Sequence, residues 1–262
     1  MRAPSSERTT TSELPAIAAD IVERIRARKP RVHCITNAVA QNFTANVLLA
    51  VGALPSMTLS PQEIGGFVAG ADALLVNLGT FDAERRAATE IAVAAAAARN
   101  IPFVLDPVFI ERSAARAEFA RALLARGPKV VRLNHAEFTV LAGAEPSRAA
   151  AQAFAREHAS VAALSGALDM VADGARIVEV ANGHALMAKV TAMGCAGSAL
   201  TAAALALEPD PLRAAAAALL MLGVAGEIAA ERAQGPGSFA VAIIDALYRL
   251  TAQDITSRAK VT

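Results

Sequence analysis

Short runs of β-branched and other apolar residues alternate with alanine-rich stretches through most of this 262-residue chain. The short apolar runs predict buried strands, and the longer alanine-rich stretches predict helices. The expected strands are residues 32–35, 73–77, 103–105, 129–132, 161–165, 170–172 and 176–180, and the expected helices between the first of them are residues 39–51, 82–99 and 114–126. Such alternation favours an α/β fold, with a mainly parallel central sheet and helices on both faces.

The last third of the chain, residues 195–250, is expected to be almost entirely helical, with breaks at the prolines of 209–211 and at 235–237. No linker or internal repeat divides the sequence, so residues 15–262 are predicted to form one domain. Residues 1–14 are polar and lack the apolar segment of a signal peptide, which predicts a flexible N-terminal tail. The charge-free stretch 214–226 is too short to span a bilayer and predicts a deeply buried helix or a subunit contact.

The charge balance and the cysteine count exclude several classes of protein. Lys and Arg number 25 against 24 Asp and Glu, a net charge of +1, so no electrostatic surface for nucleic acid is expected. Two cysteines form neither a disulfide framework nor a metal cluster. We therefore expect a soluble cytoplasmic protein that acts on a small molecule, with no nucleic-acid or membrane partner.

Polar residues stand where several of the predicted strands end. They are Asn77, Asp106, Arg132 with Asn134, and Ser165. In a parallel α/β sheet, ligands bind outside the carboxyl ends of the strands, so these side chains are expected to share one rim. Each taken alone is more often a cap or turn residue than a catalytic one.

Two carboxylates on this rim have two possible roles each. The proline that follows Asp106 holds its backbone extended. Its carboxylate either binds Mg²⁺, which prefers oxygen ligands, or caps the next helix. Glu137 stands three residues after Asn134, which predicts a capping box, while a competing interpretation turns Glu137 toward nucleotide phosphates through metal-bound water. The guanidinium of Arg132 matches the geometry of phosphate oxygens.

Residues 190–205, VTAMGCAGSALTAAAL, place Cys195 at the start of an apolar helix. A helix N-terminus attracts anions and favours a thiolate, so one hypothesis is a phosphate-accepting site with an activated Cys195. The alternative is a plain turn of small residues. His33 is expected to be a hydrogen-bonded core histidine, and Cys34 to pack as a small apolar residue.

Several motifs together resemble those of bacterial hydroxyethylthiazole kinases. In chain order they are HCITNAVAQNFTANVLLAVGALPSM (33–57), LLVNLGT (74–80), LDPV (105–108), VVRLNHAE (130–137), NGHALMAKVTAMGC (182–195) and GPGSF (235–239). Their order and spacing match the family over residues 17–255. The resemblance implies a ribokinase-like three-layer sandwich and the Mg²⁺- and ATP-dependent phosphorylation of 4-methyl-5-(2-hydroxyethyl)thiazole, a thiazole alcohol, in thiamine salvage. It also implies a homotrimer with sites between subunits.

The resemblance also assigns roles to individual residues. Arg132, Ser165 and Gly194 would contact ATP or its transferring phosphoryl group, and Asp106 and Glu137 would lie near its Mg²⁺ and phosphates. Met57, Asn37 and Ala192 would contact the thiazole, Ala192 through its backbone. Cys195 would orient the substrate hydroxyl or take its proton.

Two segments depart from the family pattern. Residues 109–113, FIERS, replace a glycine-rich run that ends in Ala-Thr, so that Glu111 adds a negative charge, Arg112 offsets it and Ser113 stands in for the threonine. Ala192 replaces a glycine, and because a positive φ there would cost about 1–2 kcal/mol, this turn is expected to have a different shape. These changes leave two alternatives open: a non-catalytic protein that binds thiazole or a thiamine precursor, and a kinase of the same fold for another alcohol such as a hydroxymethylpyrimidine.

Overall fold

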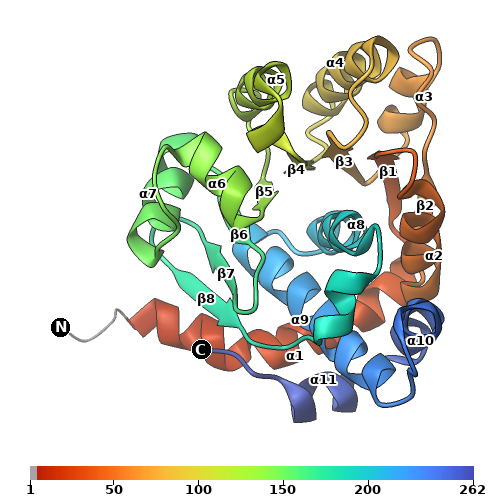
Figure 1. The fold of residues 1–262 in the computed structure, drawn as a ribbon, viewed down its shortest axis with the longest axis vertical. Coiled ribbons are helices and arrows are strands. Elements are labelled where there is room, and N and C mark those ends of the chain that lie inside the picture. The colour runs from red at the N-terminus through yellow and green to blue at the C-terminus, as the bar shows by residue number, and fades with distance from the viewer. Residues whose placement is uncertain (1–4) are drawn as a thin grey trace.

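A central eight-stranded sheet organises the computed structural model, which describes residues 5–262 (Figure 1). Its strand order is β2-β1-β3-β4-β5-β6-β7-β8, and among these strands only β7 runs in the opposite direction to the others. The strands are β1 (Arg31–Ile35), β2 (Leu54–Ser56), β3 (Ala73–Asn77), β4 (Phe103–Asp106), β5 (Val130–Leu133), β6 (Val161–Leu164), β7 (Asp169–Ala172) and β8 (Ile177–Val180). The seven predicted strands are confirmed to within one residue at each end, and β2 was not predicted.

Helices cover both faces of the sheet, as predicted. Figure 1 shows α3 to α7 on one face of the sheet, and α8 and α9 on the other. Strand residues alternate between the two faces, so that Leu74 packs with one helical layer and Leu75 with the other. The helices are α1 (Ser5–Arg28), α2 (Gln41–Val51), α3 (Ile64–Ala69), α4 (Ala83–Ala98), α5 (Ala114–Leu124), α6 (His135–Ala142), α7 (Arg148–His158), α8 (Met193–Leu205), α9 (Pro211–Ala230), α10 (Pro236–Arg249) and α11 (Ala252–Arg258), with 3-10 turns η1 (Ile110–Arg112) and η2 (Ala185–Lys189).

Helix α1 begins at Ser5, inside the segment 1–14 that we expected to be a tail. Leu14 is fully buried, and the helix packs against α9 and α11 from the far end of the chain. Residues from Ser5 on are therefore helical, and the packed body begins no later than Leu14. Residues 1–4 lie outside the described part of the chain, and the division into tail and domain stays a prediction.

Helix α9 contains the apolar stretch 214–226 and lies inside the molecule. By length and composition it is the one helix of the described residues that could cross a membrane, but 83% of its apolar window is buried. It contacts α1, α8 and α10 as well as the strands β5 to β8. The apolar composition of α9 is therefore explained by its central place in the core.

His33 on β1 is fully buried and both of its ring nitrogens have partners, which confirms the expected core histidine. Nδ1 lies 2.8 Å from Oγ of Ser56, and Nε2 lies 3.1 Å from the backbone oxygen of Thr58. Because a carbonyl only accepts, Nε2 carries the hydrogen and Nδ1 accepts from the serine. Burial lowers the pKa of His33 to about 4, so the ring stays neutral at ordinary pH.

This lowered pKa predicts an acid-dependent loss of stability. In the unfolded chain His33 titrates near its ordinary pKa, so between pH 6.5 and 4 only the unfolded state takes up the proton. The stabilisation is complete above pH 6.5 and falls by about 3 kcal/mol as the pH drops to 4. We expect His33→Gln to remove this part of the pH dependence in urea unfolding, whereas His184→Gln, at an exposed histidine, leaves it unchanged. An unaltered pH slope in His33→Gln would contradict the assignment.

Candidate active site

The polar residues at the strand ends meet at one rim of the sheet, as predicted. Strands β3, β4, β5 and β6 are adjacent and parallel, so Asn77, Asp106, Arg132 and Ser165 lie at the same edge. The start of α8 faces this edge, because Nη1 of Arg132 donates to the backbone oxygen of Gly194 at 3.1 Å. The rim and the α8 N-terminus therefore form one site.

Cys195 lies inside this site as a nearly buried thiol, 8% exposed. Its sulfur accepts hydrogen bonds from Nδ2 of Asn37 at 3.2 Å and from Nδ2 of Asn77 at 3.3 Å. Burial, followed by the negative charge of Asp106, raises the thiol pKa to about 12. The hypothesis that the helix start activates Cys195 as a thiolate is therefore wrong, because burial and a nearby carboxylate outweigh the helix N-terminus.

Asp106 ends β4 and is 4% exposed. Its Oδ2 accepts from Nδ2 of Asn77 and from Oγ of Ser198, each at 2.7 Å. The predicted alternative, a helix cap, is wrong, since Ser113 caps the following helix α5. Burial raises the pKa of Asp106 above its ordinary value, while the positive charge of Arg132 opposes that rise.

Glu137 forms the predicted capping box at the start of α6. Its Oε2 accepts from the backbone N–H of Asn134 at 2.8 Å, and the Asn134 side chain accepts from the backbone of Glu137 at 2.9 Å. Its other oxygen accepts from the backbone N–H of Phe109 at 3.2 Å. Burial, and then the charge of Asp106, raise the pKa of Glu137 to about 7. The capping role is confirmed, and its role toward phosphates stays a prediction.

Asp106 and Glu137 fit a Mg²⁺ site that is completed by a ligand. Both carboxylates are buried, and burial is the main reason that the pKa of each is raised. No group of three or more His, Cys, Asp and Glu side chains suited to a metal occurs in the described residues. One or two carboxylates with substrate phosphates and waters are the usual environment of Mg²⁺, which fits this donor set.

The segment that departs from the family, residues 109–113, folds into a tight turn beside this site. Phe109 has φ +60°, a left-handed conformation that glycine adopts more easily. Nε of Arg112 lies 3.4 Å from Oε1 of Glu111, so Arg112 offsets that charge as expected. Ser113 caps α5 by accepting from the backbone N–H of Arg116, which occupies its hydroxyl structurally. The bulky turn is thus accommodated at the cost of backbone strain.

The turn before α8 adopts the left-handed conformation at Ala192 despite its cost, so the expectation of a differently shaped turn is wrong. Ala192 has φ +73°, so an alanine occupies the left-handed position where the family has glycine. Gly194 follows as the second residue of α8, and its backbone N–H is one of the first in the helix, which lack partners within it. This end of α8 therefore presents donors to the rim.

Two buried polar atoms near the site have no partner in the structure. They are Oδ1 of Asn37 and Nε of Arg132. Buried polar atoms without partners are rare, and such atoms at a rim fit groups that bind a ligand. Ser165 directly follows β6 and its hydroxyl donates to the backbone oxygen of Leu133 at 3.3 Å. Met57 follows the edge strand β2, two strands away from Asn77 in the sheet.

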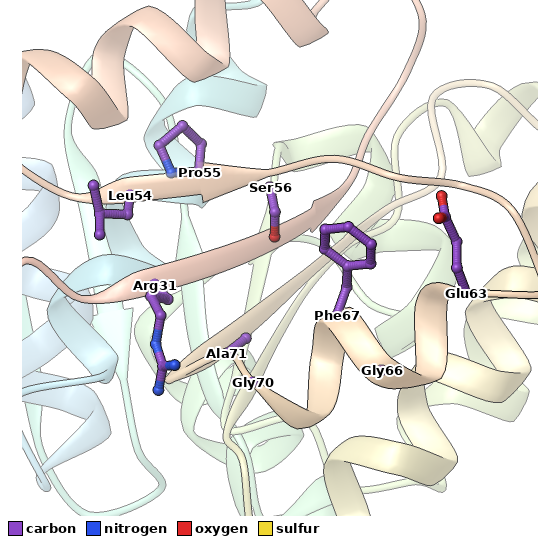
Figure 2. A pocket seen from close by; sticks show the side chains of 9 residues that line it. All are labelled: Arg31, Leu54, Pro55, Ser56, Glu63, Gly66, Phe67, Gly70 and Ala71. Carbon is purple, nitrogen blue, oxygen red and sulfur yellow. The ribbon is translucent and has the colours of Figure 1, made fainter.

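A separate hollow of about 560 Å³ lies along the outer strand β2 (Figure 2). Its walls come from the start of β1, the whole of β2 and the helix α3 with its flanks; Leu54 of β2 and Phe67 of α3 are each 46% exposed. It contains none of the predicted site residues. The predicted site residues therefore lie at the rim around Cys195 and not in this hollow, whose lining is mostly apolar.

Three residues of the site were not assigned a role from the sequence. Asn77 was recognised only as a polar strand end, Ser198 was not recognised, and Gly79 is revealed by packing alone. Ser198 stands three residues after Cys195 on α8, a spacing that places both on one helix face. A Cβ at Gly79 would lie 2.6 Å from Cβ and Nδ2 of Asn37, so only glycine leaves room for that side chain.

The fold places the chain in a structural class, the ribokinase-like α/β proteins. A ribokinase-like superfamily protein from Enterococcus faecalis superimposes with a TM-score of 0.68 at 14% identity, over 89% of this chain and 95% of that one. The pyridoxal kinase from Staphylococcus aureus in complex with pyridoxal superimposes with a TM-score of 0.61 at 18% identity, over 76% and 88%. These distant structures support the predicted three-layer fold.

The particular family follows from closer relatives. The sequence model of the hydroxyethylthiazole kinase family matches residues 22–253, and the chain belongs to that family. A probable hydroxyethylthiazole kinase from Agrobacterium fabrum is 44% identical over 94% of this chain and 95% of its own length. The hydroxyethylthiazole kinase structure from Pyrococcus horikoshii is 39% identical and superimposes with a TM-score of 0.91, over 94% and 98%.

Proposed function

We propose that this chain transfers the terminal phosphoryl group of ATP to the hydroxyl of 4-methyl-5-(2-hydroxyethyl)thiazole. The observation that carries the proposal is its membership of the hydroxyethylthiazole kinase family across almost its whole length. The rim supports it, because buried carboxylates, an arginine and a helix N-terminus are gathered at one place. Such a set suits phosphoryl transfer, which needs alignment and charge neutralisation more than covalent chemistry.

In this proposal, residues of the rim bind the phosphates of ATP and the Mg²⁺ that accompanies them. Arg132 and the backbone N–H of Gly194 bind the phosphoryl oxygens, and Ser165 contacts ATP. Asp106 and Glu137 hold Mg²⁺, directly or through water, and the cation neutralises phosphate charge when it is bound. The first turn of α8 supports this arrangement, because its free N–H groups favour anions.

The thiazole alcohol occupies the other side of Cys195, between Asn37, Met57 and the backbone of Ala192. Oδ1 of Asn37 is buried without a partner and is suited to accept a hydrogen bond from the substrate. Cys195, with a pKa near 12, is a neutral thiol and orients the hydroxyl oxygen. A neutral thiol is sufficient if the transition state is loose, because the hydroxyl then loses its proton late.

Coupled measurement of ADP release tests the proposed function directly. Purified protein is assayed with Mg²⁺-ATP and the thiazole alcohol, with hydroxymethylpyrimidine as a second alcohol. Thiazole-dependent ADP release is expected. Thiazole binding without ADP release would overturn the kinase in favour of a binding protein, and turnover with the pyrimidine alone would overturn the substrate.

Substitutions of Cys195 test its role within that reaction. We expect Cys195→Ala to lower kcat by about 10- to 100-fold, near the lower end of what a positioned acid–base group contributes, with little change in the KM for ATP. Cys195→Asp is expected to retain activity, because a carboxylate is a better proton acceptor than a neutral thiol. Cys34→Ala, at the buried cysteine of β1, is the control. Equal kcat values for the original protein and Cys195→Ala would contradict the role.

The proposal extends to a cytoplasmic homotrimer with sites between subunits, as the family resemblance implies. The rim supports shared sites only in that Met57 lies at the edge strand of the sheet, where another chain has access. Light scattering on a sizing column gives the mass of the assembly. A mass of one or two chains would contradict the trimer.

A further inference from the structure

Asn77 has every polar atom of its carboxamide in a hydrogen bond. Its Oδ1 accepts from the backbone N–H of Gly79 at 3.0 Å. Its Nδ2 donates to Oδ2 of Asp106 at 2.7 Å and to Sγ of Cys195 at 3.3 Å. Since a backbone N–H pairs only with the amide oxygen, the orientation of the carboxamide is fixed and both hydrogens of Nδ2 are directed into the site. Asn77 is 1% exposed, so no solvent competes for these bonds.

The thiol of Cys195 receives a hydrogen bond from a second amide, that of Asn37. Nδ2 of Asn37 donates to Sγ at 3.2 Å, and Gly79 leaves the space that Asn37 needs. Gly79 therefore contacts both amides: the Asn37 side chain packs against its Cα, and its backbone N–H donates to Oδ1 of Asn77. With amide hydrogens on both lone pairs of the sulfur, the thiol hydrogen is left to point toward the remaining side of the site.

We propose that Asn77 is a positioning residue of the kinase reaction, which holds the thiol of Cys195 and the carboxylate of Asp106 at a fixed separation. The inference rests on the proposed function, and extends it to a residue for which the sequence comparison gave no role. Asn77 acts through its two neighbours, orienting the group that meets the alcohol and the group that faces the phosphates. The Asn77 side chain thereby sets the distance between Cys195, which meets the alcohol, and Asp106, which faces the phosphates.

The amide hydrogens also separate two groups that repel when charged. Asp106 disfavours negative charge on the sulfur, and the N–H groups of Asn77 and Asn37 favour it. Removing Asn77 therefore leaves Asp106 without one of its two donors and leaves the sulfur with one donor fewer. Both changes disturb the relative placement of thiol and carboxylate.

A double-mutant cycle separates this role from a general effect on the fold. We expect Asn77→Ala to lower kcat about 10-fold, with the KM for ATP nearly unchanged. In the Cys195→Ala background the same substitution is expected to lower kcat by a clearly smaller factor, because the thiol is absent and only the placement of Asp106 is then lost. Gln152→Ala removes an amide that donates to the backbone oxygen of Ala175 and is the matched control, with no effect on kcat. Additive losses would overturn the proposal.

Alkylation of Cys195 by iodoacetamide gives a readout that needs no kinase activity. In a Cys34→Ala background only Cys195 reacts. Loss of a donor to the sulfur lowers its thiolate fraction, so Asn77→Ala is expected to react roughly 2- to 10-fold more slowly at a fixed pH. A site that had merely loosened would expose the thiol and react faster, which would overturn the proposal.

Asn77→Asp is measured beside Asn77→Ala, because it keeps the shape of the side chain and removes both amide hydrogens. We expect it to react more slowly still, since it adds a carboxylate next to Cys195. If Asn77→Ala does not fold, as judged by circular dichroism, Asn77→Asp decides the question on the same criterion. If the original protein itself releases no ADP, the proposed function fails. The alkylation rates do not depend on kinase activity, so they still support or overturn the placement of Cys195 by Asn77.

Discussion

Asp106→Asn is expected to lower kcat by at least about 100- to 1,000-fold, the range that loss of one preorganised electrostatic group at a reacting centre produces. Asp106 is buried at the end of β4, and its oxygen accepts from Asn77 and Ser198. Asparagine keeps the size of the side chain but removes the charge that would hold Mg²⁺ near the phosphates. Initial rates of ADP release across a range of Mg²⁺ concentrations measure the effect.

The control for this substitution is Asp245→Asn, at an exposed carboxylate on α10. It is expected to leave kcat and the Mg²⁺ dependence unchanged. The melting temperature of Asp106→Asn should not fall, because a buried carboxylate with a raised pKa is costly to the folded state. A variant that is stable and turns over at the original rate would remove Asp106 from the site.

Arg132→Met is expected to lower kcat by about 100- to 1,000-fold and to raise the KM for ATP. The guanidinium holds the backbone oxygen of Gly194 with Nη1, and its buried Nε is without a partner. Arg132 thus both places the first turn of α8 and offers donors to phosphate oxygens. Methionine fills the same space but does neither.

Arg132→Lys distinguishes charge from geometry at this position. Lysine keeps the positive charge but lacks the planar fork, so we expect it to restore only a small part of the lost activity. Arg121→Met, at an arginine of α5 whose guanidinium bonds the backbone of Val140, is the control. Full activity in Arg132→Lys would show that charge alone suffices there.

The sequence predicted those elements whose pattern is local. The strands were found because residues buried on both faces form short apolar runs, and the start of α6 was found because Asn134 and Glu137 have the spacing of a capping box. Strand β2 was missed, since Leu54 and its neighbours form only three paired residues at the sheet edge. The helical start at Ser5 was missed because the polar sequence there gives no apolar periodicity, and packing against α9 is a long-range property.

The sequence predicted which residues lie at the candidate site, but it did not predict the direction of the pKa shift of Cys195. Asp106 and Arg132 were expected on one rim from strand ends alone. The state of Cys195 was predicted incorrectly, because the helix start is visible in the sequence whereas burial and the nearby carboxylate are not. The amide bridge through Asn77 joins β3, β4 and α8, so no local spacing reports it.

The contact of α1 with α9 and α11 has a consequence for how the chain reaches its folded state. Helix α1 is synthesised before α9 and α11, against which it packs, and its Leu14 and Ile21 are fully buried in the folded chain. Until those helices are made its apolar face is exposed, so docking of α1 is a late event with high contact order. Slow refolding after dilution from denaturant, and aggregation that grows with protein concentration during that interval, are therefore expected of this architecture.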